Sequence, residues 1–138
     1  MSHEYKMKPA NLDEINLYCL IGEALWMVQH LEDALSHSIT LKKEVKKPYS
    51  MPLKKANELL EKYRFYTLGK AISLAKREAM YSESLLQDLG LFLSERNWLV
   101  HKCMSQNRDD MYSGTGKHKL FHRIKNVTEE ALILLRRC

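Results

Sequence analysis

The chain has 138 residues, 45% of them hydrophobic and 28% charged, which predicts a single globular domain over residues 1–138 and argues against a disordered chain. The formal net charge is +5, and all of it lies in residues 96–138, which hold nine Lys and Arg against four Asp and Glu. This excess favours an anionic partner such as nucleic acid, although a solvated basic face would give the same count.

Helices are expected throughout the chain, because only five Gly and three Pro occur and apolar residues recur at steps of three and four. The first predicted helix covers residues 12–45. Asn11 and Glu14 have the spacing of a capping box at its start, and Pro48 and Pro52 follow its lysine-rich end. We therefore expect a long first helix that stops before Pro48.

Two shorter helices are expected next. The segment from Leu53 to about Phe65 has apolar residues on one side and Lys and Glu on the other, which is typical of an amphipathic helix. Thr67 is a candidate cap for a third helix, whose apolar positions extend from Leu68 to Met80.

The fourth predicted helix opens at Ser82 or Ser84 and extends to about Met104, because an apolar stripe continues through this segment. Residues 105–117 are polar and contain two glycines close together, so they are expected to form an exposed loop. A fifth helix is predicted over residues 118–135. No alternation of strands and helices is visible, so the predicted fold is an all-α antiparallel bundle of about five helices.

The cellular location is predicted from two further features. No stretch approaches the roughly 18 uncharged apolar residues of a membrane span, and residues 1–11 contain no apolar run, so we expect neither a membrane anchor nor an export signal. Cys19, Cys103 and Cys138 form an odd, scattered set without CxxC spacing, which argues against a disulfide framework and a zinc site. A cytoplasmic protein without a metal or another cofactor is the expectation.

The most specific polar feature is the run E-R-N-W-L-V-H at residues 95–101. It places an Arg, an amide and a His in an otherwise apolar helix, where unpaired polar groups are costly to bury. Asn97 and His101 lie about 40° apart on an α-helix, so they are expected to touch. Arg96 lies roughly 140° from His101, so a second copy of the helix across a two-fold axis could complete one site.

Residues 96–101 read R-N-x-x-x-H, which resembles the R-x4-6-H motif of HEPN domains (higher eukaryotes and prokaryotes nucleotide-binding), including the polar residue that often follows the Arg. HEPN domains are helical bundles of about this length, with the motif near the end of a late, long helix. The resemblance covers the architecture of the whole chain, but its specific part is six residues. An Arg and a His that stabilise a helix end, without a catalytic role, would leave the same short pattern.

Many HEPN domains are metal-independent endoribonucleases that act as dimers with one composite site. The resemblance implies acid–base chemistry by His101, stabilisation of phosphate charge by Arg96, and orientation of His101 or phosphate contact by Asn97. The expected partners are RNA, a second copy of the chain and an antitoxin or regulatory protein, in a toxin or abortive-infection (anti-phage) role. The residues expected to contact RNA are Lys102, Arg108, Lys117, His118, Lys119, Arg123 and Lys125.

Alternatives stay open from the sequence. A non-catalytic HEPN adaptor would bind a nucleotide, RNA or a protein through the same groove, and a helical structural or regulatory subunit unrelated to HEPN would have no Arg–His cleft. HEPN toxins with nucleotidyltransferase antitoxins commonly have a Tyr two positions after the His, where this chain has Cys103, with Tyr112 further downstream. Control of this chain by an antitoxin that modifies such a Tyr is therefore in doubt. His118 and His122 are one turn apart, but no third ligand is placed near them, so no metal site is expected.

Overall fold

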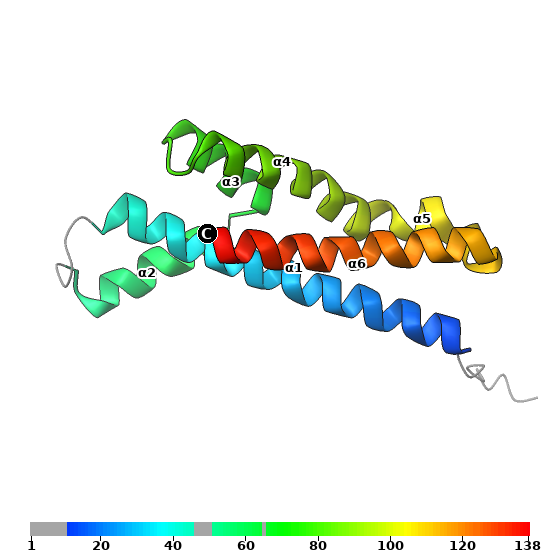
Figure 1. Cartoon of the computed structure of the whole chain (residues 1–138). Helices are drawn as coiled ribbons and strands as arrows, with labels where there is room; N and C mark the ends of the chain where they lie inside the picture. Colours follow the sequence, from blue (N-terminus) through cyan, green and yellow to red (C-terminus); the bar gives the residue numbers. More distant parts are fainter. Residues whose placement is uncertain (1–10, 46–50, 65) are drawn as a thin grey trace, which may run out of the picture.

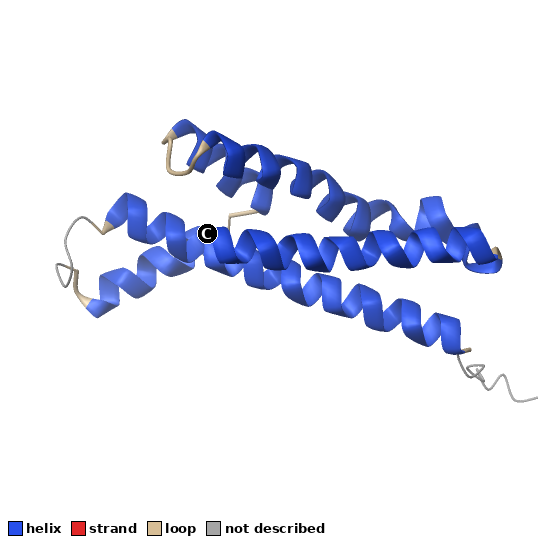
Figure 2. Cartoon of the chain, viewed as in Figure 1, coloured by secondary structure: helices blue, strands red, loops and turns tan. Residues whose placement is uncertain are grey.

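The computed structural model describes residues 11–45, 51–64 and 66–138 (Figure 1). Its elements, in chain order, are α1 (Leu12–Glu44), α2 (Leu53–Arg64), α3 (Leu68–Arg77), α4 (Glu83–Asn97), the π turn η1 (Trp98–Lys102), α5 (Cys103–Asn107), the 3-10 turn η2 (Arg108–Tyr112) and α6 (Gly114–Arg137). Figure 2 shows that most of the described residues are helical, and no strand occurs among them. The predicted all-α helical bundle is confirmed.

The three longest helices, α1, α4 and α6, form the centre of the bundle. α4 runs antiparallel to α1 and to α6, whereas α1 and α6 run in the same direction (Figure 1). Ion pairs agree with this arrangement. Asp13 near the start of α1 binds Lys117 near the start of α6, while Asp88 in α4 binds Arg137 at the end of α6. The predicted antiparallel packing therefore holds for α4, and the α1–α6 pair is parallel.

Side-chain caps explain where several helices begin. The backbone N–H of Glu14 donates to Oδ1 of Asn11 at 2.8 Å, at the start of α1. Thr67 caps α3 and Ser82 caps α4 through the same kind of bond to the third following residue. Each bond satisfies an N–H group that has no partner inside the helix. The predicted starts at Asn11 and Thr67 are confirmed, and Ser82 rather than Ser84 opens α4.

The segment predicted as a loop, residues 105–117, is mostly helical. α5 and η2 extend to Tyr112, and Ser113 caps α6, so the last helix begins at Gly114 instead of His118. The prediction was wrong because tertiary packing stabilises this polar segment: Met111 packs against the core. Short helical turns of low intrinsic stability form when such packing holds them.

Smaller differences concern the ends of the other helices. The fourth helix is interrupted after Asn97 by the π turn instead of running unbroken to Met104. α3 ends at Arg77, so Met80 lies beyond it. Phe65 and Pro48, at the predicted ends of two helices, lie outside the described residues.

The core lies where the apolar stripes of α1, α4 and α6 meet. The apolar residues that α1 buries are Leu17, Ala24, Val28, Leu31, Leu35 and Ile39. The residues that α6 buries are Leu120, Ile124, Val127, Ala131 and Leu134. Phe92 of α4 and Trp98 of η1 are 2% and 4% exposed, so the motif segment is anchored in the core on both sides of Arg96. Within the described ranges, no helix is long and apolar enough to cross a membrane.

Candidate functional site

The predicted motif lies where α4 passes into η1. Arg96 and Asn97 are the last two residues of α4, and His101 lies within the π turn. The backbone N–H of Cys103 donates to the carbonyl of Trp98, five residues earlier, which is the bonding pattern of a π turn. Single π turns inside helices are frequent at functional sites, so the backbone independently marks this segment as a candidate.

The π turn also changes the angle between Arg96 and His101. Residues five apart lie about 140° from each other on an α-helix. Bonding from residue i to i+5 winds the chain less per residue, and this brings residues five apart closer to one face. The angular argument for a second copy of the helix is therefore weaker in the structure than in an ideal α-helix.

Arg96 is partly buried and lies against α1. Its Nε is 3.4 Å from Oε1 of Glu32, and the two side chains are 26% and 29% exposed. Its Nη1 donates to Oδ1 of Asn97 at 3.2 Å. Nε and Oε1 are buried but do not complete a hydrogen bond with each other or with another described group, so the ion pair is an attraction of charges without ideal geometry. The charge expected to contact phosphate is thus partly neutralised by a carboxylate of the same chain.

No hydrogen bond joins the side chains of Asn97 and His101, which were expected to touch. The carboxamide oxygen of Asn97 accepts a hydrogen bond from Arg96, its immediate neighbour. His101 is exposed, and its imidazole forms no hydrogen bond or ion pair with any described residue. The guanidinium next to Asn97 supplies the donor that its oxygen needs. The imidazole is therefore accessible to a ligand from solvent.

A hollow of about 260 Å³ adjoins two of the motif residues. Arg96 and Asn97 line it together with Leu93 of α4 and residues 67–69 at the start of α3. His101 is not among its lining residues. The structure thus brings Arg96 and Asn97 to one depression and leaves His101 outside it.

A second set of contacts ties the motif segment to α6. The guanidinium of Arg123 donates to both carboxylate oxygens of Glu95, at 2.9 Å each, and lies 3.8 Å from the centre of the Trp98 ring. The hydrogen bonds to Glu95 raise the pKa of Arg123. Nε1 of Trp98 donates to Oδ1 of Asn107 at 3.2 Å, and Nδ2 of Asn107 donates to Oδ2 of Asp110 at 2.7 Å. These contacts join α4, η1, η2 and α6 around the motif.

The residues predicted to contact RNA divide into two groups. Lys117 and Arg123 are held by the carboxylates of Asp13 and Glu95, with N–O distances of 2.9 Å. The remaining five side chains are exposed, and they are Lys102, Arg108, His118, Lys119 and Lys125. The exposed group is directly accessible to a phosphate, whereas Lys117 and Arg123 would first have to leave a carboxylate.

Glu32 is the site residue that sequence reasoning missed. It lies on α1, between the buried residues Leu31 and Leu35, whereas its partner Arg96 is far away in the sequence. An acidic residue this close to a buried stripe could have been flagged as needing a cationic partner. Nothing in the pattern, however, selects Arg96 among the many cations of the chain.

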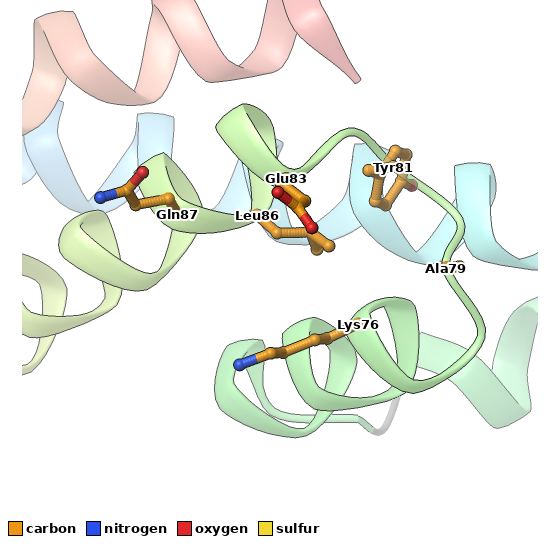
Figure 3. Close-up of a pocket in the computed structure, with 6 residues that line it drawn as sticks. All are labelled: Lys76, Ala79, Tyr81, Glu83, Leu86 and Gln87. Carbon is orange, nitrogen blue, oxygen red and sulfur yellow. The ribbon is translucent and has the colours of Figure 1, made fainter.

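A larger hollow, of about 570 Å³, lies at the turn between α3 and α4 (Figure 3). Its lining residues are Lys76, Ala79, Tyr81, Glu83, Leu86 and Gln87. None of the predicted site residues is among them. The larger hollow is therefore separate from the candidate site.

Within the described parts of the chain, no three His, Cys, Asp or Glu side chains lie close enough together to hold a metal ion. The pair His118 and His122, both exposed on α6, is not joined by a third such group.

Comparison with known proteins gives no family. No protein-family model matches this chain, and neither does any curated protein or solved structure. The HEPN resemblance rests on residues 96–101 and on the helical architecture, and it stays a prediction.

Proposed function

We propose that this chain is a metal-independent endoribonuclease of the HEPN type, with Arg96, Asn97 and His101 as its catalytic residues. The observation that carries the proposal is the π turn, which presents an exposed His101 five residues after a partly buried Arg96 at the end of an apolar helix. The charge of Arg96 is costly to place in this partly buried position, and a functional role accounts for its presence. The resemblance to the HEPN motif supplies the reaction class.

The proposed chemistry needs proton transfer and a group that stabilises charge. His101 takes the proton of the 2′-hydroxyl or gives one to the leaving oxygen, because imidazole titrates near neutral pH. Arg96 stabilises the charge that grows on the phosphate, for which its planar fork is better suited than an ammonium group. Asn97, which already accepts a hydrogen bond from Arg96, holds the guanidinium or contacts the phosphate.

RNA and a second copy of the chain are the proposed partners. Val100 and Met104 flank His101 and are 42% and 49% exposed, which supports a contact surface beside the motif. Tyr18 of α1 is also exposed and lines a depression together with Met104, so a second copy could also contact α1. A cytoplasmic toxin or abortive-infection role, with an antitoxin or regulatory protein, is proposed by analogy with the family alone.

The alternative function is a non-catalytic adaptor that binds a nucleotide, RNA or a protein through the same surface. The ion pair between Arg96 and Glu32 favours it, because a guanidinium held by a carboxylate is less available to a reacting phosphate. An enzyme and an adaptor differ in what the loss of His101 does: cleavage stops in the first case, and binding persists in both.

Cleavage of single-stranded RNA in EDTA tests the proposed function. His101→Ala should lower the rate by about 10²- to 10⁴-fold with RNA binding largely kept, and Arg96→Ala should impair both. His30→Ala removes an exposed histidine of α1 and should leave the rate unchanged. If wild type and His101→Ala are equally inert on varied RNAs but bind the same ligand, the adaptor replaces the enzyme. Cleavage that needs added divalent metal would mean that these residues are wrongly assigned.

A further inference from the structure

Arg123 connects the last helix to both ends of the segment that holds Arg96 and Asn97. Two of its N–H groups donate to Glu95, the residue before Arg96, and its Cζ lies over the Trp98 ring, 3.8 Å from the ring centre. Trp98 directly follows Asn97 and is the first residue of the π turn. A single side chain of α6 thus contacts the chain on either side of the Arg-Asn pair.

Trp98 is held from a second direction as well. It is 4% exposed, and its Nε1 donates to Asn107, which is held in turn by Asp110 of η2. The ring is therefore fixed between Arg123 on its face and Asn107 at its nitrogen. His101 lies three residues after Trp98 in the same π turn, so the backbone that carries His101 is tied to the place where the Trp98 ring is held.

We propose that Arg123 is a positioning residue for His101, acting through Glu95 and Trp98, and not a phosphate-binding residue. Bidentate bonding to a carboxylate and stacking on an aromatic face both need a planar guanidinium, and a lysine ammonium cannot do both. The carboxylate of Glu95 also occupies the edge of the guanidinium formed by Nε and Nη2, so a phosphate could pair with that edge only by displacing Glu95. The catalytic consequence of this role rests on the proposed function, whereas the structural coupling to His101 does not.

Three variants distinguish a positioning role of Arg123 from an effect of its charge alone and from a general loss of stability. Arg123→Gln removes the charge and both contacts, and Arg123→Lys keeps the charge but loses the fork and the stack. Arg137→Gln is the matched control, because Arg137 forms the other described Arg–carboxylate pair between α6 and α4, with Asp88 at 2.6 Å and similar exposure. Circular dichroism checks that each variant folds. If Arg123→Gln does not fold, Arg123→Lys carries the test.

Nuclear magnetic resonance gives a readout that needs no RNA. The chain has two tryptophans, so the indole N–H signal that remains in Trp26→Phe belongs to Trp98. The ring signals that disappear in His101→Ala belong to His101. Both Arg123 variants should shift the Trp98 and His101 signals together, and Arg137→Gln should leave both in place. If the Trp98 signal moves while the His101 signals stay at their wild-type positions, the positioning role is overturned.

Kinetics adds a second readout where wild type cleaves RNA. Both Arg123 variants should lower kcat by about tenfold or more, because a small misplacement of a reacting group is costly, with KM within about twofold of wild type. Full activity in Arg123→Lys would show that charge alone matters, and this would overturn the proposal. An inert wild type removes the proposed function and leaves the magnetic-resonance result to decide the coupling.

Discussion

Nε of Arg96 lies 3.4 Å from Oε1 of Glu32, so an ion pair with two mostly buried side chains joins the motif to α1. An RNA phosphate that binds Arg96 must compete with this carboxylate, which carries the same sign of charge. The pair therefore affects how readily the candidate site accepts an anion.

Glu32→Gln should tighten RNA binding by about two- to fivefold, because it removes a competing charge worth up to roughly 1 kcal/mol and keeps the side-chain shape. Asp33→Asn is the matched control: it removes the same charge at the next position, from a side chain that is 60% exposed and lies beside Arg64. Filter binding of one single-stranded RNA at fixed salt measures the affinity of both variants. Equal affinities of Glu32→Gln and wild type would show that the ion pair does not compete.

The proposed dimer predicts a specific effect of a charge beside the motif. Val100→Glu places a carboxylate on the exposed apolar surface next to His101, so it should convert the dimer into a monomer and lower cleavage. Ile133→Glu adds the same charge at a 54% exposed position of α6 and should stay dimeric. Sedimentation at micromolar concentration distinguishes the two states. A wild-type monomer that still cleaves RNA contradicts the composite site.

RNA binding should weaken as salt rises, because basic side chains displace counterions from phosphates. Lys119→Gln and Lys125→Gln, at two exposed positions of α6, should each lower the slope of log affinity against log salt by about one. Lys54→Gln, exposed on α2, should leave the slope as it is. The same titration measures all three variants. An unchanged slope in both Lys119→Gln and Lys125→Gln would place the RNA elsewhere on the surface.

Two neighbouring glycines of α6 should respond differently to alanine. A Cβ at Gly116 would lie 2.8 Å from Oδ1 and 3.1 Å from Cα of Asp110, whereas a Cβ at Gly114 meets nothing within 4 Å. We expect Gly116→Ala to lower the free energy of unfolding by about 1–3 kcal/mol through overpacking, and Gly114→Ala to keep or slightly raise it. Urea denaturation followed by circular dichroism compares them. Equal midpoints would mean that η2 moves away without cost.

Stability should fall in alkaline solution partly through Tyr63. This side chain is 1% exposed, and burial, with the hydrogen bond that its hydroxyl donates to Glu44 at 2.6 Å, raises its pKa above the ordinary value. The folded state therefore holds the proton more tightly than the unfolded state. The contribution to stability is complete below the unfolded pKa of about 10 and is lost as pH rises toward the raised pKa.

Denaturation midpoints between pH 8 and 11, a range chosen around that ordinary tyrosine pKa of about 10, measure this effect. Tyr63→Phe should show a shallower loss of stability with pH than wild type. Tyr18→Phe, which removes a hydroxyl that is exposed on α1, is the control and should follow wild type. The same slope for Tyr63→Phe and wild type would assign the alkaline loss to other groups.

Much of the fold could be predicted because helix caps and apolar stripes depend on residues that are close together in the sequence. Asn11, Thr67 and Ser82 each cap a helix through a bond to the third following residue, so residue type and spacing are sufficient to locate the start. Apolar stripes at helical spacing likewise identify the buried face of α1 and α6. The candidate motif was found for the same reason, since residues 96–101 are adjacent in the chain.

Only the tertiary structure decided those features that depend on contacts between residues distant in the sequence. The helical form of residues 103–112 and the π turn at Trp98 occur together with the contacts of Asn107, Met111 and Arg123, and no short sequence pattern indicates these contacts. Arg123 is one of several basic residues in the sequence, but packing places it between Glu95 and Trp98. The sequence by itself thus determined where helices begin and which faces they bury, because hydrogen bonds and periodicity act over a few residues. Which charges meet, and whether a cation faces solvent or a carboxylate, was decided by how the helices pack.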